Sequence, residues 1–469
     1  MKNFRNSTPS KILRLLQRVG TITTFSLILV FLSGCQSYQP SPLDHTAHAA
    51  DWRARSPSDE KVRDFARRID TTAPTSIPFD PNDGLTLAEA QIVALVYNSA
   101  LRVARLKAGV AQATAEHAGD WDDPEIDLSI LKITESVPTP WVINSALSFT
   151  IPISGRLGVE RARAEAEAYA QLARVVEEEW RTVVDLTKIW LEWSANRFRL
   201  KEAERAVNSL GPVVQTADKL AEAGEFLRTE STLFKIEQES RRADVARLRG
   251  MVNEGEQEIR MLMGISPTAP AKLIPTLASP NANKSANIEE TNPKLIRLQS
   301  DYEVAELSLK REIRKQYPDL QLGPQFEKDQ GQSRIGMIGG IPIPIFNSNK
   351  GGIATARASR EVARAVFETT LETMEGQLAA RQVRLEGVRL RRQFINENIV
   401  PLVDQQIDDS RNLLELGESG GIVLLESLSR GYEAKLDLIE TRLEESIIQA
   451  EIRHLLGPER LAVTTQPLQ

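Results

Sequence analysis

Two periods of apolar residues alternate along the chain, and each predicts a different kind of element. In residues 125–153 and 320–345, apolar side chains recur at about every second position, which is typical of β-strands. Turn residues interrupt both stretches, so the pattern predicts two strand pairs with strands of about 10 residues. Tilted strands of that length cross a bilayer. The apolar positions are Ile126, Leu128, Ile130, Leu147, Phe149, Ile151 and Ile153 in the first pair and Leu320, Leu322, Phe326, Ile335, Met337, Ile341, Ile343 and Ile345 in the second.

Helical patterns fill most of the remaining chain. A first helix is predicted from Thr86, which has Glu89 at capping-box spacing, to about residue 118. Residues 158–222 have a helix-forming composition; roughly 65 residues at 1.5 Å each make a rod of about 95 Å. Later apolar residues follow an approximate seven-residue repeat, which indicates coiled-coil packing. They are Phe367, Leu371, Met374, Leu378, Leu385, Val388, Ile395 and Ile399, then Leu425, Leu428, Tyr432, Leu436, Ile439, Leu443 and Ile447.

One unit of helix, two strands, long helix and helix occurs twice. The matching groups are Asn98 and Leu101 with Asn292 and Leu295 (offset 194), Pro124 with Pro318 (194), Ile151-Pro152-Ile153 with Ile343-Pro344-Ile345 (192), and Gly224, Leu262 and Gly264 with Gly417, Leu455 and Gly457 (193). We therefore predict repeat 1 over residues 85–265 and repeat 2 over 292–457, with an irregular linker at 266–291 and a tail at 458–469. In each repeat the first and last helices together nearly equal the long helix in length. They could lie end to end beside it.

The N-terminus predicts export and a lipid anchor. Residues 1–34 carry five basic residues, no acidic residue and an apolar run at 25–32 that is too short to span a bilayer, so we predict a signal peptide there. Leu32-Ser33-Gly34-Cys35 resembles the bacterial lipobox, which predicts acylation of Cys35; an incidental cysteine is the alternative. Gln36 after the cysteine resembles lipoproteins sorted to the outer membrane. Residues 35–84 are rich in Pro, Ser, Thr and Asp and are predicted to form a lipidated tether with one weak helical patch, at Val62, Phe65, Ala66 and Ile69.

Composition narrows the function classes. A formal net charge of −6 over 469 residues gives no reason to expect a nucleic-acid partner. One cysteine and four scattered histidines indicate neither a Cys-rich nor a His-rich metal site. The acidic group of Asp120, Asp122 and Asp123 is read as a helix stop and strand entry rather than a metal site. We expect no cofactor, no metal and no catalysis.

Four strands cannot form a closed membrane structure alone. Open sheet edges in hydrocarbon leave amide and carbonyl groups without partners, and about eight strands is the smallest barrel. The chain is therefore expected to close a barrel with copies of itself. Aromatic residues near the predicted strand ends, Trp121, Trp141, Tyr317 and Phe346, would suit interfacial girdles. The alternative is a small soluble hairpin layer with these aromatics in an ordinary core.

These features together resemble the TolC-like outer membrane efflux family. The resemblance rests on the lipobox, the repeat, the Ile-Pro-Ile strand ends, the Gly-containing turns and the closing Leu-Met-Gly and Leu-Leu-Gly, and it covers residues 85 to about 457. The segment Ile341 to Gly351 further resembles the branch that serves heavy-metal exporters. The resemblance implies a mainly α protein with a transmembrane β-barrel portion: a homotrimer with a 12-stranded β-barrel on a 12-helix α-barrel. It also implies a periplasmic adaptor and an inner-membrane pump as partners.

The resemblance implies that the turns at Gly224 and Gly417 form a periplasmic tip that closes at rest. Some members hold the tip shut with an arginine and acidic residues. The second turn, Gly417-Glu418-Ser419-Gly420-Gly421, has no arginine, so such a lock is not expected there. Arg228 with Glu225 or Glu230 is a hypothetical contributor to closure, the alternative being that these charges are simply solvated.

The predicted function is that of a passive conduit for solutes in the outer membrane. Type I protein secretion, a periplasmic adaptor and a non-conducting scaffold lipoprotein are the alternatives. An adaptor would show one hairpin between small β domains rather than the same unit twice.

Overall fold

The computed structural model describes residues 37–72, 79–278, 287–415 and 421–458. The chain divides into two units, residues 1–52 and 53–469. The predicted signal peptide and Cys35 lie outside the described residues. Helix α2 (His45–Ala54) begins after Asp44, whose side chain accepts hydrogen bonds from the Thr46 and Ala47 amides at 3.0 and 2.9 Å.

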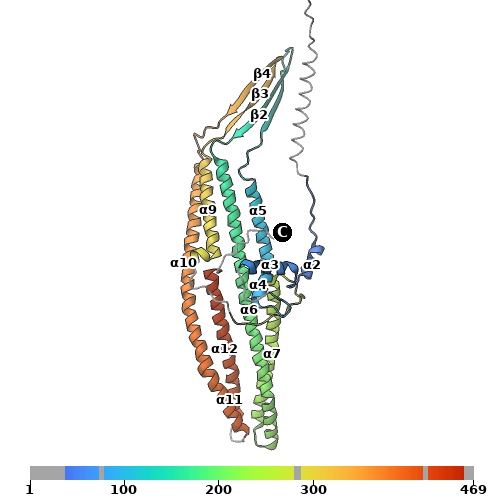
Figure 1. Cartoon of the computed structure of the whole chain (residues 1–469), viewed down its shortest axis with the longest axis vertical. Coiled ribbons are helices and arrows are strands. Elements are labelled where there is room, and N and C mark those ends of the chain that lie inside the picture. The colour runs from blue at the N-terminus through green and yellow to red at the C-terminus, as the bar shows by residue number, and fades with distance from the viewer. Residues whose placement is uncertain (1–36, 73–78, 279–286, 416–420, 459–469) are drawn as a thin grey trace, which may run out of the picture. The chain divides into compact units, whose positions relative to one another are not determined.

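The second unit contains the predicted repeat of helices and strands, after helix α3 (Glu60–Thr72). Repeat 1 comprises α4 (Leu87–Tyr97), α5 (Ser99–Glu116), β1 (Glu125–Lys132), β2 (Trp141–Ile151), α6 (Arg156–Ala223) and α7 (Arg228–Met263). Repeat 2 comprises α8 (Ile288–Thr291), α9 (Pro293–Arg314), β3 (Leu320–Asp329), β4 (Gln332–Gly340), α10 (Lys350–Phe394), the π-helical turn η1 (Ile395–Ile399), α11 (Val400–Glu415) and α12 (Gly421–Leu456). Within this unit the sheet lies at one end of the helices, and the α6–α7 turn, the end of α11 and the start of α12 lie at the other (Figure 1).

Three features of the helices differ from the sequence-based expectation. The predicted first helix breaks at Asn98, whose extended backbone (ψ 132°) ends α4 while its side chain caps α5. The predicted irregular linker ends in the short helix α8. The helical patch predicted in the tether is helix α3, in which Val62 is fully buried and joins the core with Trp190. Part of the expected tether is therefore an integral piece of the body.

Four rows of helices lie side by side in the second unit. The α5–α7 row packs against α6, α6 packs against the α9–α12 row, and that row packs against α10. The strands follow the same order, β1-β2-β3-β4, and every neighbouring pair is antiparallel. One flank of the unit is therefore formed by α5, α7 and β1, and the opposite flank by α10 and β4.

The short helices of each repeat join end to end, as the length comparison predicted. Asn98 caps α5 through its Oδ1 atom, and its Nδ2 donates to the Leu262 carbonyl of α7 at 2.9 Å. Asn292 caps α9 in the same way and donates to the Leu455 carbonyl of α12 at 2.8 Å. Each final helix ends in a left-handed glycine, Gly264 (φ 72°) or Gly457 (φ 83°). The repeated residues therefore build the same joint twice.

No helix among the described residues has an apolar stretch that is long enough, and free enough of charge, to span a membrane.

Candidate functional site

The register of the sheet gives it one apolar and one polar face. Directly paired residues of antiparallel strands point to the same side, so the pairs Ile126–Leu147, Ser145–Phe326 and Phe326–Ile335 define one face. The apolar face contains Ile126, Leu128, Ile130, Ile143, Ser145, Leu147, Phe149, Ile151, Leu320, Leu322, Pro324, Phe326, Ile335, Met337 and Gly339, and Lys132, Lys328 and Ser333 lie on it at the end far from the helices. The polar face includes Glu125, Asp127, Ser129, Asn144, Ser148, Thr150, Gln321, Gln325, Glu327, Arg334 and Gly336, together with the apolar Leu131, Val142, Ala146 and Ile338. The predicted strand positions Leu147, Phe149 and Ile151 thus lie on β2, on the apolar face.

The apolar face is not covered by other described parts of the chain. Ile126 is 70% exposed, Ile335 is 87% exposed and Met337 is 71% exposed. A contiguous apolar surface of this kind marks a protein or membrane contact in a folded protein. The two outer strands, β1 and β4, each pair on one side only. The sheet therefore presents an apolar face together with two open edges.

The expected positions of Ile341, Ile343 and Ile345 on a barrel strand are wrong for this chain. Strand β4 ends at Gly340. Pro342 and Pro344 follow, and because proline has no amide hydrogen it cannot donate to a strand ladder. The three isoleucines keep exposed side chains in the segment that leads to α10.

Exposed aromatic residues lie at both ends of the sheet. Trp141 begins β2 at the end far from the helices, and the Lys132 ammonium lies 5.8 Å from its ring centroid. Trp121, Tyr317 and Phe346 lie just outside the helix-proximal ends of β1, β3 and β4, and all three are more than half exposed. The alternative reading of these aromatics as ordinary core is thus wrong in the described chain.

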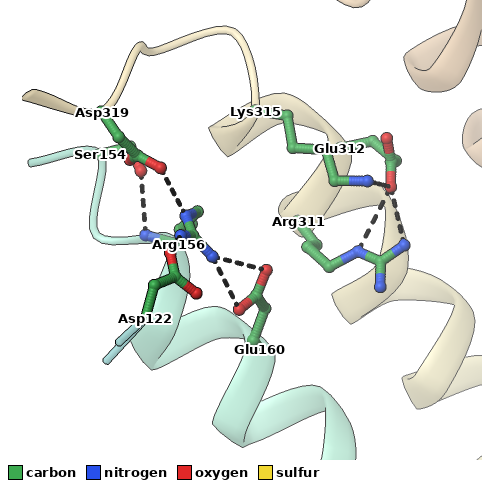
Figure 2. Close-up of polar contacts among 8 residues, drawn as sticks. All are labelled: Asp122, Ser154, Arg156, Glu160, Arg311, Glu312, Lys315 and Asp319. Carbon is green, nitrogen blue, oxygen red and sulfur yellow. Dashed lines mark hydrogen bonds and ion pairs between the residues drawn. The ribbon is translucent and has the colours of Figure 1, made fainter. Parts of the chain in front are cut away.

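A charged cluster joins the two repeats where strands meet helices (Figure 2). Arg156, the first residue of α6, lies 2.7 Å from Asp122 before β1 and 2.9 Å from Asp319 before β3. Its third partner is Glu160, one turn along α6 at 3.3 Å. The Arg156 side chain is only 20% exposed, so these pairs are screened less than surface pairs are. Asp122 thus holds a strand entrance in place, which the acidic group was expected to do.

A second charged group beside it surrounds Glu312 of α9. The carboxylate accepts from Lys315 and Arg311 at 2.8 and 2.9 Å and from the Asn349 amide at 2.9 Å. Burial alone would raise the pKa of Glu312. The hydrogen bonds from its three partners outweigh that effect and lower the pKa from 4.5 to about 2. The arrangement connects the end of α9 to the residue that precedes α10.

At the opposite end, the structure describes only the first of the two predicted turns. Gly224 ends α6 in the left-handed conformation (φ 81°), and Glu225 and Arg228 are exposed on the α6–α7 turn. Among the described residues, neither Glu225 nor Glu230 pairs with Arg228, so their part in closure stays a hypothesis. The other predicted turn positions, Gly417 and Glu418, lie outside the described residues.

An apolar tip cluster packs the ends of α6 and α11 against the first turns of α7 and α12. It consists of Leu210, Val213, Val214, Ala217, Phe234, Leu414 and Leu424, with Phe226 packed against them. Gly421, which begins α12, fits closely against Phe226, because a Cβ atom there would lie 2.3 Å from the ring. The predicted seven-residue repeat includes Leu425 and Leu428, which pack against this cluster, but it did not indicate the contributions of α6, α7 and α11.

Between the tip cluster and the middle of the helices lies a cavity of about 1010 Å³. Phe198 of α6, Arg241 of α7, Asp404 of α11 and Tyr432 of α12 contribute to its wall. The cavity separates α11 from α6.

Comparison with known proteins places the fold. No protein-family model and no curated protein matches the chain. Among solved structures, the outer membrane protein VceC from Vibrio cholerae matches with a TM-score of 0.69 at 16% identity, over 79% of this chain and 96% of that one. The CmeC outer membrane channel of Campylobacter jejuni matches with a TM-score of 0.68 at 13% identity, over 90% and 94%. The open state of the Neisseria gonorrhoeae MtrE outer membrane channel matches with a TM-score of 0.66 at 15% identity, over 79% and 88%.

The chain has the fold of these outer membrane proteins. The expectation of a mainly helical chain with a few antiparallel strands is thereby confirmed. At these identities the likeness concerns the fold and does not assign roles to individual side chains.

Proposed function

We propose that this chain is the outer membrane channel of a tripartite efflux system, a passive homotrimeric conduit that carries solutes out of the cell. The observation that carries the proposal is the four-stranded sheet, with its exposed apolar face, polar opposite face and two open edges. The aromatic residues at both ends of the sheet support it, because such residues collect at the two membrane interfaces.

The open edges argue for several copies of the chain in one barrel. Each unpaired backbone group in hydrocarbon costs several kcal/mol, so β1 and β4 need partners within the membrane. Four strands are too few to close a barrel, which needs about eight. Three copies of the four-stranded sheet give the twelve strands that the resemblance implies, enough to leave a water-filled lumen.

The helical flanks support the same arrangement. Exposed positions on α10 alternate in spacings of four and three residues, as in a coiled-coil seam, and this seam faces no described helix. Its residues are Val362, Val366, Thr369, Thr373, Gly376, Ala380, Val383, Gly387, Leu390 and Phe394. The opposite flank carries shorter exposed rows of the same spacing: Val103, Leu106, Val110 and Ala113 on α5, and Leu233, Ile236, Ser240 and Ala243 on α7. Different surfaces on the two flanks suit a head-to-tail ring of copies.

The conduit needs no reaction within this chain. With the apolar face toward lipid, the polar face of the sheet lines the lumen, and solutes pass through water. The Cys35 acyl anchor would hold each copy in the outer membrane, since two or three acyl chains give stable attachment. The periplasmic adaptor and the inner-membrane pump enter through the sequence resemblance, and the pump would select the substrate.

Single-channel recording in planar bilayers tests the proposal. The purified mature protein should insert as a trimer and conduct. Leu128→Arg and Ser129→Arg form a matched pair, because these neighbours on β1 are both exposed but point to opposite faces. Arginine on the lipid face costs about 2–4 kcal/mol near the bilayer midplane, so Leu128→Arg should lose insertion. Ser129→Arg should insert and change only the conductance.

Two results would contradict the proposal. One is equal insertion of both variants, which would mean that the apolar face does not meet lipid. The other is a correctly inserted trimer that never conducts, even with its tip loosened, which would favour a scaffold lipoprotein. If the trimer conducts, the sensitivity of a deletion strain to metals, dyes and antibiotics would identify the class of solute that it carries.

A further inference from the structure

The charged residues of the four strands are sorted between the two faces of the sheet. Direct pairing places the acidic residues of the strands on the polar face, and these are Glu125, Asp127, Glu327 and Asp329. The Arg334 guanidinium lies on the same face, 3.4 Å from the Glu327 carboxylate. The two lysines of the strands, Lys132 and Lys328, lie on the apolar face. On the strands, the apolar face therefore carries positive charge and no negative charge.

The two lysines flank β2 at the end of the sheet far from the helices. Lys132 ends β1 and pairs with Trp141, and Lys328 of β3 pairs with Ile143, one row nearer the helices. Two strand spacings of about 4.8 Å and one row of about 7 Å separate the two lysine Cα atoms by about 12 Å. Lysine has a flexible four-carbon stem, so both ammonium groups can reach one group that lies over β2. The hydroxyl-bearing Ser333 pairs with Lys328 on the same face.

The charge of the two lysines is not neutralised within the described chain. Both side chains are exposed, and neither forms an ion pair with another residue that the structure describes. The Lys132 ammonium lies 5.8 Å from the centroid of the Trp141 ring, which leaves its other side open. Glu135, on the loop between β1 and β2, is exposed and pairs with neither lysine. A counter-charge for this pair of lysines is therefore left to a group outside the described chain.

The length of β2 places these lysines at the level of lipid headgroups. The 11 residues from Trp141 to Ile151 span about 34 Å between their first and last Cα atoms. A tilt of about 40° reduces this span to about 26 Å, close to the apolar band of about 25 Å on membrane barrels. With Ile151 at one boundary of that band, Trp141 and Lys132 reach the other. In the proposed orientation the helices lie in the periplasm, so this second boundary belongs to the outer leaflet.

We propose that Lys132 and Lys328 bind the phosphate groups of a lipid headgroup in the outer leaflet, with Trp141 beside them at the boundary of the acyl chains. The inference rests on the proposed function, which directs the apolar face toward lipid. An ammonium group binds phosphate as a point charge with three donors, and clustered basic residues at a membrane surface bind anionic headgroups. Two ammonium groups on separate strands favour a headgroup with two phosphates over a headgroup with one. The bound lipid would connect β1 to β3 across β2.

Native mass spectrometry of the purified mature protein tests the site, with lipid A that carries two phosphate groups or one as the probes. The wild type should bind the two-phosphate form more tightly. Lys132→Gln combined with Lys328→Gln should weaken that binding about 25-fold, because each basic residue near an anionic lipid surface contributes a factor of about five. The corresponding Arg pair keeps both charges and should retain the affinity. Arg334→Gln is the matched control, because it removes a cation from the same end of the sheet but on the polar face, and it should leave the affinity unchanged.

Three results would overturn the site. They are equal lipid affinity of the Gln pair and Arg334→Gln, equal affinity of the wild type for both lipids, and displacement of the lipid by millimolar inorganic phosphate, which would indicate a site for the free anion. The two lipids and inorganic phosphate are compared on the wild type, so these arms decide even if the Gln pair fails to assemble. Insertion of Leu128→Arg and Ser129→Arg tests the proposed function separately. The lysine site can fail while Leu128→Arg loses insertion as expected, whereas equal insertion of those two variants refutes the channel whatever the lipid affinity.

Discussion

Replacing Asn292 with alanine should destabilise repeat 2 by more than the loss of an ordinary helix cap. Asn292 is 1% exposed and makes two kinds of contact at the joint between α9 and α12. Its Oδ1 atom accepts from the Lys294 amide at 2.9 Å, which caps α9. Its Nδ2 donates to the Leu455 and His454 carbonyls, at 2.8 and 3.2 Å, at the end of α12. The variant loses both functions.

The magnitude follows from these contacts. Loss of an N-cap costs about 1 kcal/mol. The His454 carbonyl keeps a bond from the Trp180 indole at 3.2 Å, so its loss is small. The Leu455 carbonyl loses the buried Asn292 amide, and an unsatisfied buried carbonyl costs about 1–3 kcal/mol. The total is about 2–4 kcal/mol for Asn292→Ala, and Asn98→Ala should match it because Asn98 makes the equivalent contacts in repeat 1.

Guanidinium unfolding of the detergent-solubilised protein, followed by far-ultraviolet circular dichroism, measures this difference. Asn287→Ala is the matched control, because Asn287 is exposed and caps only the four-residue α8. It should cost about 0.5–1 kcal/mol. Asn292→Ser keeps a capping oxygen but cannot reach α12, so it should recover only about 1 kcal/mol of the loss. Equal losses for Asn292→Ala and Asn287→Ala would refute the reasoning, since the bonds to α12 would then contribute nothing.

Three further changes test other parts of the account. Gly264→Ala should lower the melting temperature clearly more than Gly155→Ala, because both glycines have positive φ but only at Gly264 would a Cβ lie 2.1 Å from the Tyr97 carbonyl; equal shifts would contradict the close joint. The pKa of Glu312 is lowered to about 2, so its contribution to stability is present above pH 4.5 and is lost as the pH falls through 2. Glu312→Gln should therefore cost up to about 3 kcal/mol at pH 7 and progressively less in acid, by thermal melting across pH; a loss independent of pH would exclude this role. Arg228→Ala should raise resting single-channel conductance if Arg228 helps to close the tip, and an unchanged conductance together with unchanged leakage would exclude that role.

Much of the fold could be predicted because this sequence repeats its structural signals. Asn98 and Asn292 match in sequence because each caps a helix and holds the end of another. The alternating apolar residues of β1 and β2 predicted strands correctly, and the capping box at Thr86 and Glu89 is present. At these positions the local sequence signals and the tertiary contacts favour the same structure, so the sequence pattern alone was sufficient to predict these helices and strands.

Other features depend on contacts between distant segments and leave no local pattern. Arg156 was not identified as important, because its partners Asp122 and Asp319 come together only when both strand pairs meet the helices. The strand predicted through Ile345 ends at Gly340, because prolines remove donors from a segment that still alternates in hydrophobicity. The tip cluster likewise assembles from four helices.

The central claim is that open edges β1 and β4 pair between copies of the chain. Cysteines introduced at positions 126–130 of β1 and 333–338 of β4, scanned in pairs in the membrane-inserted protein, test it most directly. These strands are at opposite edges of one sheet, so a disulfide between them must join different copies. The account predicts covalent products of two and three chains and none larger. Accessible cysteine pairs that never join chains, or ladders that continue beyond three, would contradict it.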